Sequence, residues 1–144
     1  MKKIMVINGV NLNMLGIREK GIYGDSTYDG LCDYIRSKCA DLQVRLDFFQ
    51  SNHEGAIVDC IQKCYFDKFD GIVLNPGAHT HYSYALYDAI KSISPIPVIE
   101  VHISDIHSRE EFRRISVTAP ACIAQISGKG FDGYVQAIKM LMEI

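Results

Sequence analysis

The stretch of sequence that decides the fold is Gly71-Ile72-Val73-Leu74-Asn75-Pro76-Gly77. Its first four residues form a short apolar run, which is typical of a strand buried on both faces. The polar turn that follows leads into a helical pattern of apolar residues over 85–93. Because a buried strand that leads into a helix is half of a β–α–β unit, this stretch predicts a parallel sheet.

The same alternation recurs along the chain. Further strand candidates occupy residues 4–7, 44–49, 97–101 and 121–126, and further helical patterns occupy residues 31–39, 57–64 and 134–142. Two helix starts are indicated by Ser51-x-x-Glu54 and Ser108-x-x-Glu111, since a hydroxyl and a carboxylate at this spacing form a capping box.

This alternation predicts an α/β fold of the flavodoxin-like class, a three-layer sandwich with a five-stranded parallel sheet in the order 2-1-3-4-5. No repeat, linker or charge block divides the sequence, so we expect one domain over residues 1–144. A ligand is expected beyond the carboxyl ends of strands 1, 3 and 4, where this strand order creates a switch point.

The composition excludes several classes of function. With 15 basic and 17 acidic side chains, the formal net charge of −2 gives no electrostatic basis for binding nucleic acid. The first apolar run, residues 4–7, is too short for a signal peptide or a membrane span, so we expect a cytoplasmic protein without a membrane partner. The odd number of cysteines, 5, suits reduced thiols packed in a core. Cys60 and Cys64 share a helix face without further ligands at zinc-like spacing, which favours packing over metal binding.

A long connection follows the first strand, from Asn8 to Gly24, with a helix expected to start near Ser26 or Thr27. It contains glycines, asparagines, Arg18 and Tyr23, and a connection this long in a compact domain is usually functional. We interpret residues 16–25 as an active-site lid. A satisfied surface loop is the alternative.

Four of the 5 histidines follow strands 3 and 4, namely His79, His81, His102 and His107. A single histidine there would more often be a structural hydrogen-bonding group, but several at one cleft favour acid–base chemistry. The spacing His79-x-His81 also leaves zinc open, although no acidic or cysteine ligand completes such a set.

Arg109 and Arg113 are spaced to lie on one face of the helix expected after Ser108. Either this face is simply solvated, or one arginine binds an anionic or polyhydroxylated ligand through its planar guanidinium.

The sequence does not match the well-known protein classes that share this fold. Asn8 and Asn75 stand where a phosphorelay receiver domain has acidic residues. The loop after strand 1 has no Ser or Thr between Asn8 and Gly24, as a flavodoxin would need, and the glycine patterns of dinucleotide and P-loop sites are missing.

Eight short motifs resemble type II 3-dehydroquinate dehydratase, in order and across the whole chain. They are Asn8-Gly9-x-Asn11-Leu12, Leu15-Gly16-x-Arg18-Glu19, Tyr23-Gly24, Leu74-Asn75-x-Gly77, Thr80-His81, Ala85-Leu86-x-Asp88-Ala89, Glu100-Val101-His102-Ile103-Ser104 and Arg109-Glu110-Glu111-Phe112-Arg113. The resemblance implies a lyase of the shikimate pathway, which leads to chorismate and the aromatic amino acids. It would dehydrate 3-dehydroquinate to 3-dehydroshikimate without a cofactor or metal. Quinate breakdown passes through the same reaction.

The resemblance also implies the catalytic roles. Tyr23 would be the base that removes the proton alpha to the ketone, with Arg18 as its activator. Asn11 would hold the enolate through water. His102 would protonate the departing hydroxyl, oriented by Glu100.

The substrate-binding residues implied in the same way are Asn75, His81, Asp88, Ile103, Ser104 and Arg113. Asp88 would reach the site of a neighbouring subunit in a dodecamer built as a tetramer of trimers. Val10 and Lys20 stand where the family commonly has proline.

The roles of Arg18 and Tyr23 agree with simple electrostatics. Tyrosine has an ordinary pKa near 10, so its phenolate costs about 4 kcal/mol at pH 7, and a nearby arginine in a closed lid offsets that cost.

Two readings compete with an enzyme of this type, namely a binding domain that lost turnover and a structural oligomer module. A lysine Schiff base would give the same product, but no lysine falls at the ligand-side end of a predicted strand.

Overall fold

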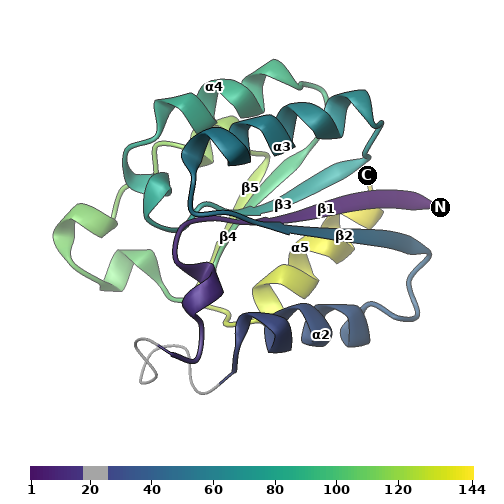
Figure 1. Cartoon of the computed structure of the whole chain (residues 1–144), viewed down its shortest axis with the longest axis horizontal. Helices are drawn as coiled ribbons and strands as arrows, with labels where there is room; N and C mark the ends of the chain where they lie inside the picture. Colours follow the sequence, from purple (N-terminus) through teal and green to yellow (C-terminus); the bar gives the residue numbers. More distant parts are fainter. Residues whose placement is uncertain (18–25) are drawn as a thin grey trace.

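A sheet of five parallel strands forms the centre of the molecule, in a computed structural model that describes residues 1–17 and 26–144 (Figure 1). The strands are β1 (Lys2–Asn8), β2 (Val44–Gln50), β3 (Gly71–Asn75), β4 (Val98–His102) and β5 (Ala124–Ser127). Their order is β2-β1-β3-β4-β5, and all adjacent pairs are parallel. The predicted flavodoxin-like sheet is therefore confirmed.

Helices cover both faces of the sheet. They are α2 (Tyr28–Lys38), α3 (Glu54–Phe66), α4 (Tyr84–Ser92) and α5 (Asp132–Met142). Figure 1 shows α3 and α4 on one face and α2 and α5 on the other, which gives the three layers that the sequence predicts.

Two separate hydrophobic clusters fill the spaces between these layers. Ile4 and Val6 of β1 belong to the cluster under α2 and α5, whereas Met5 and Ile7 belong to the cluster under α3 and α4. Successive residues of a strand point to opposite faces, so both sets are buried, and the strands read as unbroken apolar runs.

Four of the five thiols are buried within the helical layers, as expected, and that of Cys122 is half-buried. Within residues 1–17 and 26–144, no group of three or more His, Cys, Asp or Glu side chains is arranged to hold a metal ion.

The helix starts were predicted with mixed success. Thr27 caps α2 by accepting a hydrogen bond from Gly30 N, as expected. The prediction at Ser51 was wrong, because α3 begins at Glu54 with His53 as its N-cap residue. The Ser51 hydroxyl instead accepts the backbone N–H of His53, which forms a local turn before the helix.

The prediction of a helix after Ser108 was also wrong. The chain there forms the short 3₁₀ helices η3 (Ile106–Ser108), η4 (Glu111–Arg113) and η5 (Ala119–Ala121). Arg109 has an extended backbone and Glu110 has ψ of 152°, and because neither conformation is helical, no α-helical turn can continue from η3 to η4. Strand β5 accordingly begins at Ala124 rather than at Ala121.

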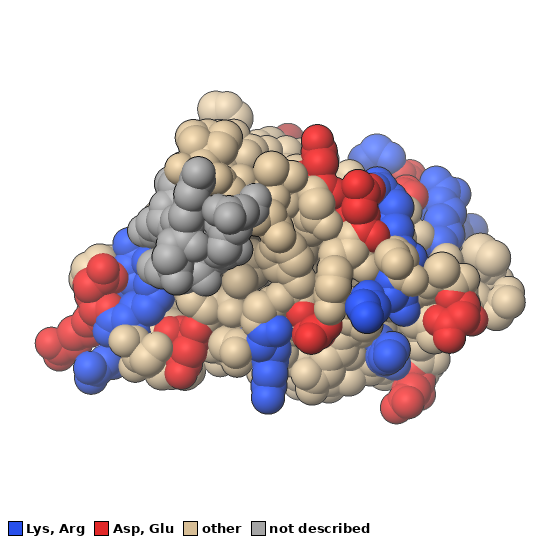
Figure 2. All heavy atoms as spheres, turned by 90° about the horizontal axis from the view of Figure 1, so that it is seen from below, with Lys and Arg blue, Asp and Glu red and all other residues tan. Residues whose placement is uncertain are grey.

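The face formed by α2 and α5 carries basic and acidic side chains side by side (Figure 2). This mixture agrees with the nearly balanced charge of the sequence. Among the helices of the described residues, none has the length and apolar character needed to cross a membrane.

Candidate active site

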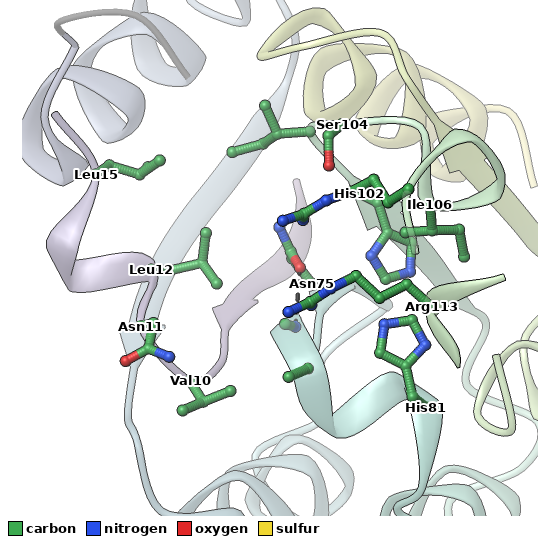
Figure 3. Close-up of a pocket in the computed structure, with 14 residues that line it drawn as sticks. Val10, Asn11, Leu12, Leu15, Asn75, His81, His102, Ser104, Ile106 and Arg113 are labelled. Atoms are coloured by element: carbon green, nitrogen blue, oxygen red, sulfur yellow. Dashed lines mark hydrogen bonds between the residues drawn. The ribbon is translucent and has the colours of Figure 1, made fainter. Parts of the chain in front are cut away.

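A pocket of about 340 Å³ lies where the ligand was predicted, beyond the carboxyl ends of β1, β3 and β4 (Figure 3). Its volume is at the low end of the ~300–1,000 Å³ that is typical of small-molecule sites. Of the predicted site residues, those that line it are Asn11, Asn75, His81, His102, Ile103, Ser104 and Arg113.

Two glycines allow the loops after β1 and β3 to touch and form one side of the pocket. A Cβ at Gly9 would lie 2.3 Å from the carbonyl oxygen of Pro76. Gly77 has φ of +63°, and a Cβ there would lie 2.7 Å from the carbonyl oxygen of Val10. The contact between the loops therefore depends on the absence of side chains at these two positions.

Asn75 is held in the pocket floor by a buried chain of hydrogen bonds. Its Nδ2 donates to the hydroxyl of Tyr134 at 2.8 Å, and that hydroxyl donates to Oδ1 of Asn8. Asn75 Oδ1 accepts the N–H of Gly77 at 3.0 Å. Helix α5 thus orients a pocket residue on β3, a role of Tyr134 that sequence reasoning missed.

His102 and Glu100 form the polar pair at the end of β4. Nε2 of His102 lies 2.9 Å from Oε2 of Glu100, which has no exposed surface. Burial alone would raise the pKa of Glu100, but the hydrogen bond and charge of His102 oppose it, with further hydrogen bonds from Thr118 and Gln125. The net result lowers the pKa of Glu100 to about 2, so the carboxylate is ionised at neutral pH.

Only two of the four grouped histidines line the pocket. His81 is in the lining, and its Nδ1 lies 2.8 Å from the carbonyl oxygen of Ile115. His79 is buried beside it, but its Nδ1 contacts the hydroxyl of Tyr82 at 2.7 Å. His107 is exposed in η3 and outside the lining. The expected convergence of several histidines is thus reduced to His81 and His102.

Two arginines give the pocket its charge. Arg109 and Arg113 both line it, although Arg113 lies in η4 and Arg109 lies between η3 and η4 rather than both on the expected helix face. Glu110 accepts a hydrogen bond from Nε of Arg113, and Figure 3 shows Arg113 extending toward Asn75. The described residues of the lining include no Asp or Glu, which suits an anionic ligand.

Among the predicted residues that the structure describes, Asp88 lies away from the pocket. It is exposed on α4. Arg18 and Tyr23 lie outside the described residues, as do Lys20 and most of the expected lid. Asn11 lies at the rim with a left-handed backbone, φ 69°, and its N–H donates to Oδ1 of Asn52.

Sequence reasoning missed the hydroxyl groups behind Glu100, which belong to Ser116, Thr118 and Thr80. Ser116 and Thr118 lie 16 and 18 residues after Glu100 in an irregular segment, so no local spacing signals the contact. Thr80 stands next to His81 in a recognised motif, and this was the one available signal.

These features define an α/β protein of flavodoxin-like fold with a polar, basic pocket that contains an acid–base group. A family model described as "Dehydroquinase class II" matches residues 2–142. The chain belongs to this family, as the motifs predict.

Individual relatives and a solved structure support the same family. A curated protein named 3-dehydroquinate dehydratase, from Caldicellulosiruptor bescii, is 58% identical over 144 residues, covering 100% of this chain and 99% of its own. One of the same name from Clostridium acetobutylicum is 60% identical over 139 residues, 96% of this chain and 95% of its own. The crystal structure of a type II dehydroquinase from Butyrivibrio crossotus has a TM-score of 0.95 at 58% identity, covering 97% of each chain.

Proposed function

We propose that this protein is a type II 3-dehydroquinate dehydratase, which removes water from 3-dehydroquinate through an enolate to give 3-dehydroshikimate. The observation that carries the proposal is the pair of His102 and ionised Glu100 at a pocket that also holds two arginines. A carboxylate behind a histidine stabilises its imidazolium form, which is the form that can donate a proton to a leaving hydroxyl.

The reaction then needs only proton transfers. The phenolate of Tyr23 takes the proton alpha to the ketone, and the electrons form the enolate, which Asn11 holds through water. The enolate re-forms the ketone as the beta hydroxyl departs with a proton from His102. Water and a conjugated enone result, so the atoms balance without a cofactor.

The remaining residues bind the substrate. Arg113 suits the substrate carboxylate, because its guanidinium offers paired N–H donors. Asn75, His81 and the Ile103-Ser104 pair would bind carboxylate or hydroxyl groups. All four residues lie in the lining, which supports these assignments.

Several parts of the proposal concern the protein beyond this pocket. Residues 1–144 would act as one catalytic domain in which residues 16–25 serve as the lid, with Arg18 beside Tyr23. The protein would work in the cytoplasm, in the shikimate pathway, as a dodecamer in which Asp88 completes a neighbouring site. The exposed position of Asp88 outside its own pocket is compatible with that arrangement.

The test is direct. Purified protein with chelator present is mixed with 3-dehydroquinate, and ultraviolet absorbance is followed, because the enone product absorbs where the substrate does not. Steady appearance of the enone is expected. If the absorbance does not change, the protein is either a binding domain without turnover or a structural module. Calorimetry distinguishes the two, because only a binding domain would bind the substrate.

Removal of the proposed base or its activator should abolish most of this turnover. We expect Tyr23→Phe and Arg18→Ala each to lower kcat by at least about 100-fold, the lower range of general base catalysis. The same absorbance assay measures the effect, with Tyr65→Phe and Arg45→Ala as controls on exposed side chains far from the pocket. Near-normal turnover in either variant would contradict the assignment.

A further inference from the structure

The carboxylate of Glu100 is surrounded by four hydrogen-bond donors although it has no exposed surface. Oε2 accepts from Nε2 of His102 at 2.9 Å, from Oγ of Ser116 at 2.8 Å and from Nε2 of Gln125 at 2.8 Å. Oε1 accepts from the hydroxyl of Thr118. Three of these donors converge on Oε2 and one on Oε1, so both oxygens of the buried carboxylate are hydrogen-bonded.

The direction of each hydroxyl bond follows from counting protons. An ionised carboxylate only accepts, so the single protons of Ser116 and Thr118 are both directed at Glu100. Thr80 Oγ1 lies 2.7 Å from Ser116 Oγ and 2.8 Å from Thr118 Oγ1. Since those two oxygens have no further proton to give, the single proton of Thr80 is directed at one or the other of them, and the hydroxyl protons of the network point toward Glu100.

The same reasoning determines which nitrogen of each pocket histidine is protonated. Because Glu100 only accepts, His102 carries a proton on Nε2 and leaves Nδ1 for the pocket. The carbonyl of Ile115 also only accepts, so His81 carries a proton on Nδ1 and leaves Nε2 for the pocket.

One short segment, residues 115–118, therefore contacts His81 directly through the carbonyl of Ile115 and reaches His102 through Glu100. It is attached to the loop after β3 by the bond from Val117 N to the carbonyl oxygen of Thr80, at 2.7 Å. None of its residues lines the pocket. Any effect that it has on chemistry must therefore pass through Glu100 and His81.

We propose that residues 115–118 are the positioning element of this site, in which Thr118 and Ser116 hold Glu100, and through it His102, in the orientation required for the acid step. This inference rests on the proposed role of His102 as the acid. Thr118 is the better probe because it has no exposed surface and has close isosteres.

The kinetic test compares Thr118→Val, which removes the hydroxyl at nearly constant volume, with Thr118→Ser, which keeps it, and adds Ser116→Ala. We expect Thr118→Val and Ser116→Ala to lower kcat by about 10- to 100-fold, a usual effect of removing a group that orients a functional side chain. KM should change by less than about threefold, because the substrate contacts remain, and Thr118→Ser should restore most of kcat. Ser92→Ala, which removes a hydroxyl bonded to the carbonyl oxygen of Ala89, should leave kcat unchanged.

A second measurement is independent of turnover. ¹⁵N spectra of histidine-labelled full-length protein distinguish the two neutral forms of imidazole, and His102→Ala and His81→Ala assign the signals. At alkaline pH, we expect His102 to be protonated on Nε2 and His81 on Nδ1 in the wild type. We expect the Nε2–H form of His102 to lose population in Thr118→Val.

The results distinguish a failure of this inference from a failure of the proposed function. The inference would be overturned if folded Thr118→Val kept kcat within about twofold of wild type. If the valine variant does not fold, the same result with Ser116→Ala would overturn it. So would His102 protonated on Nδ1 in the wild type. An inactive wild type with the expected histidine forms would overturn the proposed reaction and leave the positioning of His102 by this segment supported.

Discussion

Glu100 and His102 are two residues apart on β4, so both side chains project to the same side of the strand. This spacing explains how neighbouring positions in the sequence can form an acid–base pair. It does not by itself explain how a carboxylate without exposed surface stays ionised, since burial favours its neutral form. The hydrogen bond and charge of His102 oppose the effect of burial first, and further hydrogen bonds come from Thr118 and Gln125, which belong to distant parts of the sequence.

A pH-dependent stability follows from the same residue. The pKa of Glu100 is lowered from 4.5 to about 2, so its ionised form stabilises the folded state above pH 4.5, and this contribution disappears as pH falls toward 2. At 1.36 kcal/mol per pKa unit the contribution is about 3 kcal/mol. Urea unfolding at pH 7 and pH 3 should show a larger loss of free energy of unfolding for wild type than for Glu100→Gln. Equal losses in the two proteins would contradict the low pKa.

At the scale of elements, the pocket depends on how closely two loops approach. The loop after β1 and the loop after β3 are in backbone contact, with Gly9 N bonded to the carbonyl oxygen of Asn75 at 2.7 Å. Adjacent parallel strands bring these loops to one edge of the sheet, and η1 (Leu12–Met14) then supplies apolar lining through Leu12. The element that supports both histidines, residues 115–118, has no regular secondary structure of its own.

A substitution at Gly77 tests the contact between the two loops, and a matched control separates this effect from the strain of a positive φ. Gly77→Ala should destabilise the protein by about 1–3 kcal/mol from its positive φ alone. It should also lower kcat/KM, because its Cβ would displace the carbonyl of Val10 next to Asn11. Gly130→Ala is the matched control, since Gly130 has φ of +60° and open space around its Cβ position. Chemical denaturation and the absorbance assay measure the two effects, and equal kcat/KM in both variants would count against the role of the loop contact.

At the scale of the whole molecule, one chain presents a pocket that lacks Asp88. That residue lies on the exposed surface of α4, whereas the pocket opens beyond the ends of β1, β3 and β4. The proposed assembly would bring Asp88 of one subunit to the pocket of another, as in a cyclic arrangement of identical chains.

Mixed oligomers test this arrangement. Asp88→Ala and Tyr23→Phe should each be impaired alone, but co-expressed chains should recover activity. In a cyclic assembly about a quarter of the sites would combine an intact Tyr23 with an intact Asp88 from the neighbour. The absorbance assay on the co-purified mixture, compared with the two separate variants, measures the recovery. A mixture no more active than its components would place Asp88 outside the shared site.

The sequence by itself determined the fold class, because its buried strands read as apolar runs and its helices as periodic patterns. It also identified the side chains that follow β1, β3 and β4, since parallel strands place their carboxyl ends at one edge. Seven of the predicted site residues accordingly line the pocket. The family was recognisable from motifs such as Glu100-Val101-His102, which keep their spacing within one element.

Only the tertiary structure decided which polar groups meet. It showed that His81 and His102 line the pocket, whereas His79 and His107 do not. It also showed 3₁₀ turns in place of the expected helix after Ser108, and a hydrogen bond from Asn75 to Tyr134. It also brought Thr118 to Glu100 across 18 residues of chain. The physical reason is that hydrogen bonds between side chains depend on distance in space, whereas patterns in sequence report only the spacing within one helix or strand.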